Sequence, residues 1–203
     1  MGTEKIPSLM IRMAIPSVIA QVINILYNIV DRIYIGHISG VGAAALTGVG
    51  LTFPIITLIS AFSAFVGSGG APLASIWMGK NDKKHAEKIL GTGVFMLLCF
   101  SLILMAVFLI FQRPLLYAFG ASDATIGYAM EYLTIYLIGT VFVEIALGLN
   151  PFIIAQGRST TAMMSIVIGA VINIVLDPIF IFGFHMGVKG AAIATVISQA
   201  VSA

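Results

Sequence analysis

The sequence is short of charged residues and of cysteine, and each shortage excludes a class of protein. Only 9% of its 203 residues are charged, against about 25% in an average soluble protein. Hydrophobic residues make up 60%, and the mean hydropathy is +1.10. A soluble domain of this length cannot bury so much apolar surface, so we exclude a water-soluble enzyme, a nucleic-acid-binding protein and a disordered tail. The single Cys99 excludes a disulfide framework and a multi-cysteine metal site.

What the sequence does contain is a series of long apolar runs, which predict an all-α polytopic protein embedded in the lipid bilayer. The runs do not alternate as barrel strands do, and helices are the other way to satisfy a backbone in lipid. We expect a six-transmembrane-helix bundle over residues 1–203, with spans at about 7–38, 41–78, 89–111, 128–155, 161–182 and 190–203. The last run is still apolar at Ala203, so we expect that span to be incomplete and the chain to be part of a longer protein.

Basic residues are distributed unequally between the two ends of these spans. One end carries seven and the other three: Lys5, Arg12, Lys80, Lys83, Lys84, Lys88 and Arg158 against Arg32, Arg113 and Lys189. By the positive-inside rule, the end with the N-terminus is cytoplasmic. We interpret the lysine cluster at 80–88 as a solvated loop in preference to a specific lipid-binding site.

Three acidic residues, Asp31, Glu144 and Asp177, lie inside apolar runs. A carboxylate at bilayer depth costs about 2.5–3.5 kcal/mol even on the mildest scale, so such residues are functional candidates by default. The alternative is a structural ion pair. Only Arg32 lies near Asp31 in sequence and no basic residue lies near Asp177, so we favour function for both. For Glu144 the two interpretations stay open.

A polar stripe leads up to Asp31 along the first span. Its members are spaced by 4, 3, 4 and 3 residues and therefore share one helical face: Ser17, Gln21, Asn24, Asn28 and Asp31, with Tyr27 beside them. Such a face must meet protein or water, so we predict that Gln21, Asn24, Tyr27 and Asn28 line a cavity. The alternative is hydrogen bonding between packed helices. Pro16 precedes the stripe and is either a hinge or a proline tolerated in the first turns.

The fifth span repeats parts of this pattern. Asn173 and Asp177 lie four residues apart on one face, where they suit either a proton site or a sodium site. With gaps, residues 171–195 also echo residues 22–47, matching Asp177 to Asp31 and Thr195 to Thr47. Two related helix pairs, each with a buried acid, are typical of transporters built from repeats.

Motifs of soluble and intramembrane enzymes are missing from the sequence. No serine hydrolase spacing, dinucleotide-binding loop or Walker A lysine is present, and the three histidines are not clustered. We therefore expect no enzyme activity and no cofactor.

The order of these features resembles the multidrug and toxic compound extrusion (MATE) transporters. The resemblance is carried by the first span with Pro16 and Asp31, its ending DRIYIG, the loop GKNDKKHAE, and the stretch NIVLDPIFIFGFHMGVKGAAIAT. It covers essentially the whole chain. It implies a twelve-helix protein of two bundles, of which this chain is the N-terminal one and the C-terminal six-helix bundle of the same parent chain is its partner.

The resemblance also implies a function and a set of residues. The expected protein is a secondary multidrug efflux antiporter in the cytoplasmic (inner) membrane of a prokaryote, exporting small lipophilic cations in exchange for H+ or Na+. The matching cation-site positions are Asp31, Asn173, Asp177 and Thr195; the matching cavity positions are Asn24 and Tyr27, and the matching proline is Pro16. Glu144 has no counterpart that we assign.

Two other functions stay open. A lipid-linked oligosaccharide flippase of the same superfamily would need several cationic side chains in its cavity to hold pyrophosphate. A non-transporting membrane scaffold would use Asp31 and Asp177 only to hold helices together.

Overall fold

The structure, a computed structural model, describes residues 6–203, and every regular element in that range is a helix. Lys5 lies outside the described residues. In chain order the elements are α1 (Ile6–Gly36), α2 (Gly42–Leu51), α3 (Phe53–Gly79), α4 (Lys83–Ala118), α5 (Ile126–Ile138), α6 (Thr140–Ala155), α7 (Ser159–Pro178), the π-helix η1 (Ile179–Gly183) and α8 (Val188–Ser202). The predicted all-α fold is confirmed.

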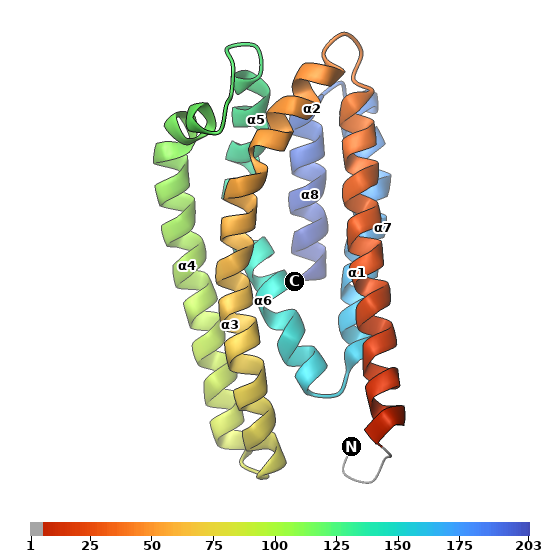
Figure 1. The fold of residues 1–203 in the computed structure, drawn as a ribbon, viewed down its shortest axis with the longest axis vertical. Helices are drawn as coiled ribbons and strands as arrows, with labels where there is room; N and C mark the ends of the chain where they lie inside the picture. The colour runs from red at the N-terminus through yellow and green to blue at the C-terminus, as the bar shows by residue number, and fades with distance from the viewer. Residues whose placement is uncertain (1–5) are drawn as a thin grey trace.

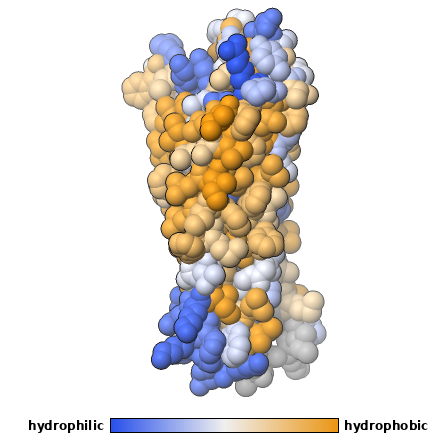
Figure 2. Space-filling view, turned by 90° about the vertical axis from the view of Figure 1, so that its left-hand side faces the viewer, coloured by the Kyte–Doolittle hydropathy of each residue, from blue (hydrophilic) through white to orange (hydrophobic). Residues whose placement is uncertain are grey.

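Most of these helices are long and apolar enough to cross a bilayer. Four stretches qualify by themselves: Met10–Gly36, Gly42–Gly79, Lys83–Ala118 and Ser159–Gly183. The pair α5 and α6 makes a fifth if taken as one bent span, and α8 is a shorter apolar helix. An apolar band lies between polar ends on the face drawn in Figure 2. The protein is therefore a multi-pass membrane protein.

The helices run up and down along one axis (Figure 1). α1 packs along α7, which runs in the same direction, while α3 packs against both α4 and α6. The turns after α3 and α6 lie at the same end as the N-terminus, and the connections before α2, α5 and α8 lie at the other end. This topology puts the turn residues Lys80 and Arg158 at the N-terminal end.

The stretch predicted as one span over 128–155 is bent by 61° between α5 and α6. The break is at Gly139, where a Cβ atom would lie 2.4 Å from Cγ2 of Val196, so the missing side chain lets α8 approach. The Thr140 hydroxyl donates to the Tyr136 carbonyl oxygen (3.3 Å), a bond of the kind that bends helices. The bend lets α5 pack on α2 and α8 while α6 packs on α3.

The start of α4 is fixed by Asp82. Its Oδ1 accepts from the His85 backbone N–H (3.1 Å), and its Oδ2 lies 2.7 Å from Nδ1 of His85. The backbone N–H bond and then the ring contact hold the pKa of the Asp82 carboxyl below its ordinary value. At pH values above the ordinary aspartate pKa, the Asp82 carboxylate therefore stabilises the folded state fully. This stabilisation is lost as the pH falls through the lowered pKa of Asp82 in the folded state.

We expect Asp82→Asn to lower the thermal stability of the full-length encoded protein at pH 7. The difference between the two proteins should shrink as the pH falls below about 4, the ordinary aspartate pKa, because the native carboxylate is then being protonated. Unfolding curves in detergent from pH 7 down to pH 3 check this. A difference that stays constant over the whole series would rule out the carboxylate as its source.

Candidate functional site

Two of the three acids inside apolar runs, Asp31 on α1 and Asp177 near the end of α7, lie next to one another. Their side chains lie close enough to interact with one another. Asp31 is 7% exposed and Asp177 is fully buried. Among the described residues, Oδ1 of Asp31 and Oδ2 of Asp177 have no hydrogen-bond partner. Two carboxyl groups in contact repel one another when both are charged, so the pair favours a proton or a cation between them.

Asn173 and Thr195 complete this cluster from α7 and α8. The Asn173 amide Nδ2 donates to Oδ1 of Asp177 (3.3 Å) and to Oγ1 of Thr195 (3.5 Å). Because its amide points this way, the Asn173 Oδ1 is left buried without a partner in the part of the chain described. The cluster therefore offers three oxygens that lack a partner among residues 6–203, from Asp31, Asn173 and Asp177. Oxygen sets of this kind hold hard cations, and the carboxyl pair can share a proton instead.

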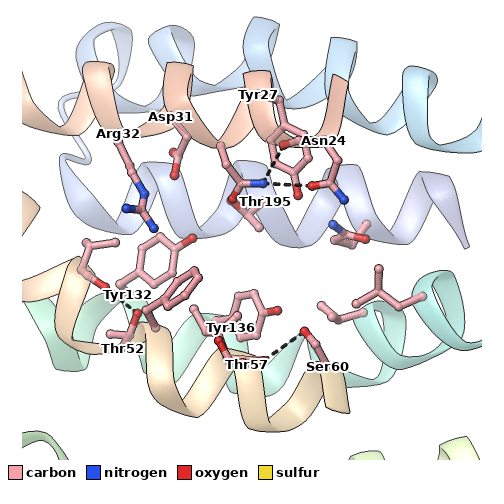
Figure 3. Close-up of a pocket in the computed structure, with 17 residues that line it drawn as sticks. Asn24, Tyr27, Asp31, Arg32, Thr52, Thr57, Ser60, Tyr132, Tyr136 and Thr195 are labelled. Carbon is pink, nitrogen blue, oxygen red and sulfur yellow. Dashed lines mark hydrogen bonds between the residues drawn. The ribbon is translucent and has the colours of Figure 1, made fainter. Parts of the chain in front are cut away.

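A cavity of about 330 Å³ lies beside the carboxyl pair. Asn24, Tyr27 and Asp31 reach it from α1, and Tyr132 and Tyr136 face them across the gap (Figure 3). The Asn28 amide lines it too, donating to the Asn24 carbonyl oxygen (2.7 Å) and side-chain oxygen (3.0 Å).

A second cavity of about 190 Å³ lies further along α1. Gln21 lines this one, and Asn24 and Tyr27 line both. The polar stripe of the first span thus faces hollow space from Gln21 to Asp31, whereas its first member, Ser17, lines neither cavity.

Several cavity residues are not predicted by the sequence. Tyr132 and Tyr136 lie four residues apart on α5, Thr57 and Ser60 three apart on α3, and Gln199 four after Thr195. Each spacing places the two residues on one helical face, and this is the sequence feature that could have identified them. Tyrosine and hydroxyl residues are common in membrane helices, however, so the spacing does not separate a cavity face from a packed one.

Arg32 brings a positive charge to the cavity next to Asp31. It is the one Lys or Arg among the lining residues, and its guanidinium lies 5.4 Å from the centre of the Phe53 ring. The cavity wall therefore combines one fixed cation with the Asp31 carboxyl group.

Glu144 stands apart from this cluster. It is fully buried on α6, and neither carboxyl oxygen has a hydrogen-bond partner among the described residues. The Ser63 hydroxyl on α3 is its polar neighbour, but it is not placed to make a hydrogen bond. Its helical neighbours Val143 and Leu147 line the larger cavity. Glu144 thus lies behind the cavity wall, in the α3–α6 interface.

Pro16 lies inside α1, which continues through it. Proline removes one backbone hydrogen bond from the helix interior. The next residue, Ser17, donates its hydroxyl to the Met13 carbonyl oxygen (3.0 Å), which also favours bending. The helix is therefore locally weak at Pro16, where the polar stripe begins.

Of the two residue pairs matched between the repeated stretches, only the acids Asp31 and Asp177 lie together. Asp31 and Asp177 meet because the parallel helices α1 and α7 pack together. Thr195 joins them, but Thr47 is exposed on α2 and donates to the Ala43 carbonyl oxygen (2.8 Å). One member of each repeat therefore builds the carboxyl pair, and the threonine comes from the second repeat alone.

Comparison with known proteins shows the family to which this bundle belongs. The family described as MatE matches residues 16–179. The chain belongs to the MATE family. The multidrug export protein MepA of Staphylococcus haemolyticus is 30% identical to it over 193 residues, which are 95% of this chain and 42% of that protein. MepA of Staphylococcus aureus strain NCTC 8325 is 26% identical over 96% of this chain and 43% of its own length.

Solved MATE structures share the fold. A MATE transporter in its bent conformation is 31% identical, with a TM-score of 0.88 over 96% of this chain and 43% of its own. An outward-facing multidrug resistance MATE transporter of the MOP superfamily is 30% identical, with a TM-score of 0.88 over 96% and 42%. This chain thus spans less than half the length of the relatives it matches and corresponds to the N-terminal half of the MATE fold. MATE proteins are transporters, which confirms that the chain is not an enzyme.

Proposed function

We propose that this chain is the N-terminal half of a secondary antiporter that exports lipophilic organic cations and drugs in exchange for H+ or Na+. The observation that carries the proposal is the buried pair Asp31 and Asp177, each with an oxygen that lacks a partner among residues 6–203, and Asp31 lines a cavity with polar groups in its wall. The multidrug export named for the MepA relatives supports the substrate class.

The coupling ion is assigned to Asp31, Asn173, Asp177 and Thr195. A proton would sit between the two carboxyl groups, and a sodium ion would take the free oxygens of Asp31, Asn173 and Asp177. Either ion lowers the negative charge of the cluster. The bound ion thereby weakens the attraction of the cavity for a cationic drug, because the ion and the drug are attracted by the same negative charge.

The substrate is assigned to the two cavities along α1. The amides of Gln21, Asn24 and Asn28 supply hydrogen bonds, while Tyr27, Tyr132 and Tyr136 offer aromatic faces that attract cations. Few polar groups among apolar walls suit ligands of varied shape.

The hinge is assigned to Pro16, where α1 is locally weak. Bending there would move the polar stripe relative to α7 and change the cavity as the ion leaves. A structure related to this chain has been solved in a bent conformation and in a straight one, which supports a mobile element in the family.

The proposed location is the cytoplasmic (inner) membrane of a prokaryote, with the N-terminus in the cytoplasm. The basic turn residues Lys80 and Arg158 lie at the N-terminal end, and the positive-inside rule makes that end cytoplasmic. The C-terminal six-helix bundle of the parent chain would close the cavities from the side of α1, which is the least covered of the long helices.

The rival functions predict different cavities. A flippase for pyrophosphate-linked sugars would need several cations, whereas Arg32 is the one lysine or arginine among the lining residues. A scaffold would not need hollow space beside its buried acids. We therefore place both behind antiport.

The test uses the full-length encoded protein in proteoliposomes loaded with a fluorescent lipophilic cation. A proton gradient and a sodium gradient are imposed separately. We expect one of them to drive cation movement well above the leak of protein-free vesicles. Movement under neither gradient would refute antiport.

A further inference from the structure

A groove of about 460 Å³ runs between α3 and α4, and no part of the proposed transport cycle uses it. We propose that this groove binds one acyl chain of an anionic phospholipid, whose headgroup sits at the lysine-rich turn between the two helices. The proposal needs only that α3 and α4 span a membrane, so it stands independently of the transported substrate.

The groove stays open because Gly69 on its floor has no side chain. Gly69, Gly70 and Gly93 line it. A Cβ on Gly69 would meet nothing within 4 Å, while one on Gly70 would lie 2.4 Å from the Phe152 ring, which closes the floor from behind. The rim residue Phe65 is 66% exposed. The groove, called the furrow below, is thus apolar and opens to the outside of the bundle.

The length of the furrow matches one leaflet. On α3 it extends from Phe65 to Trp77, which is about 18 Å at 1.5 Å per residue. Half of the bilayer's hydrocarbon core is about 15 Å. A helix crossing the whole membrane would need a face about twice as long, so the furrow fits an acyl chain of one leaflet better than a partner helix.

The mouth of the furrow is lined by polar side chains. Trp77, His85 and Lys88 line it, with the His85 ring stacked on Trp77 at 4.5 Å and an interplanar angle of 18°. The Lys80 ammonium lies 4.7 Å from the Trp77 ring centre, and Asp82 is engaged by His85. Tryptophan is favoured at membrane interfaces, so the mouth lies at headgroup depth.

The charge at this mouth is positive. Four lysines occupy residues 80–88 against two acids, Asp82 and Glu87, and the Asp82 carboxylate is engaged by His85. Lysines at this depth attract anionic headgroups. The lysine cluster by itself favours a solvated loop, because the furrow beside it arises from packing, which residue order does not reveal.

Trp77 is the only tryptophan of the chain and reports on the site directly. The full-length protein is reconstituted in phosphatidylcholine vesicles containing a small fraction of lipid with brominated acyl chains, which quench a nearby tryptophan. The brominated lipid is phosphatidylglycerol in one series and phosphatidylcholine in the other. The Trp77 signal is the emission lost on Trp77→Phe.

We expect brominated phosphatidylglycerol to quench Trp77 several-fold more than brominated phosphatidylcholine at the same low fraction. Lys80→Gln with Lys88→Gln should remove this preference, and Arg158→Gln, at the same membrane end, should keep it. Gly69→Leu fills the furrow without a backbone clash and should reduce quenching by both lipids. Gly91→Leu, equally open but outside the furrow, is its matched control.

Equal quenching by the two lipids would show an unselective lipid-facing surface and overturn the proposal. So would a Trp77 that neither lipid quenches, because protein would then cover the furrow. A preference for phosphatidylglycerol that remains after both lysine replacements would also overturn the proposal, because the headgroup would then be bound by residues other than these lysines.

Discussion

Asp177→Asn is expected to reduce gradient-driven export of a lipophilic cation at least tenfold, to the level of protein-free vesicles. The asparagine oxygen can still accept from the Asn173 amide, which now bonds Oδ1 of Asp177, so the local packing should survive. What is lost is the charge, and with it the means to take up and release an ion beside Asp31. Transport assays with the full-length encoded protein measure this, together with its thermal stability.

Asp123→Asn is the matched control. Asp123 is exposed in the loop before α5, where it accepts from the Tyr117 hydroxyl (3.1 Å). We expect this variant to transport like the wild type. Near-normal export by Asp177→Asn would contradict the assignment and move coupling to Glu144 or to the C-terminal bundle.

Gly190→Ala is expected to cost about 1–3 kcal/mol of stability and to impair export as well. A Cβ at Gly190 would lie 2.7 Å from the backbone carbon of Phe180, 2.9 Å from its oxygen and 3.0 Å from the backbone nitrogen of Ile181. Backbone atoms cannot swing away as a flexible side chain does. The start of α8 must therefore lift off η1, and α8 carries Thr195.

Gly183→Ala tests the same connection without the clash. Gly183 ends η1, and a Cβ there would meet nothing within 4 Å. We expect Gly190→Ala to lower the unfolding temperature by several degrees and Gly183→Ala to leave it unchanged. Equal effects of the two changes would mean that the close approach of α8 to η1 is not what makes Gly190 necessary.

The sequence indicates the main features of the site because charge inside an apolar run is expensive. Asp31 and Asp177 stand out for that reason, and the spacing from Gln21 to Asp31 places the polar stripe on one face. Their meeting in space was expected from the family resemblance, since nothing in residue spacing says which helices pack together.

Other features depend on tertiary packing and could not be predicted. The bend at Gly139 follows from the approach of Val196 on α8, and glycines are too common in membrane helices for one of them to mark a break. Tyr132 and Tyr136 line the cavity because of where α5 packs, against α2 and α8. The match of Thr47 to Thr195 likewise fails to build two equivalent sites, because α2 turns Thr47 to the outside.

The most direct test of a single ion site shared by Asp31 and Asp177 is to count the ions displaced when a lipophilic cation binds. Calorimetric titration of the full-length protein in two buffers of different ionisation enthalpy gives the protons released, and titrations with and without sodium give the competing sodium. We expect drug binding to displace a proton or a sodium ion from the wild type. Asp31→Asn and Asp177→Asn should each abolish the displacement, while Asp123→Asn should not. Displacement that persists in both single variants would contradict the shared site.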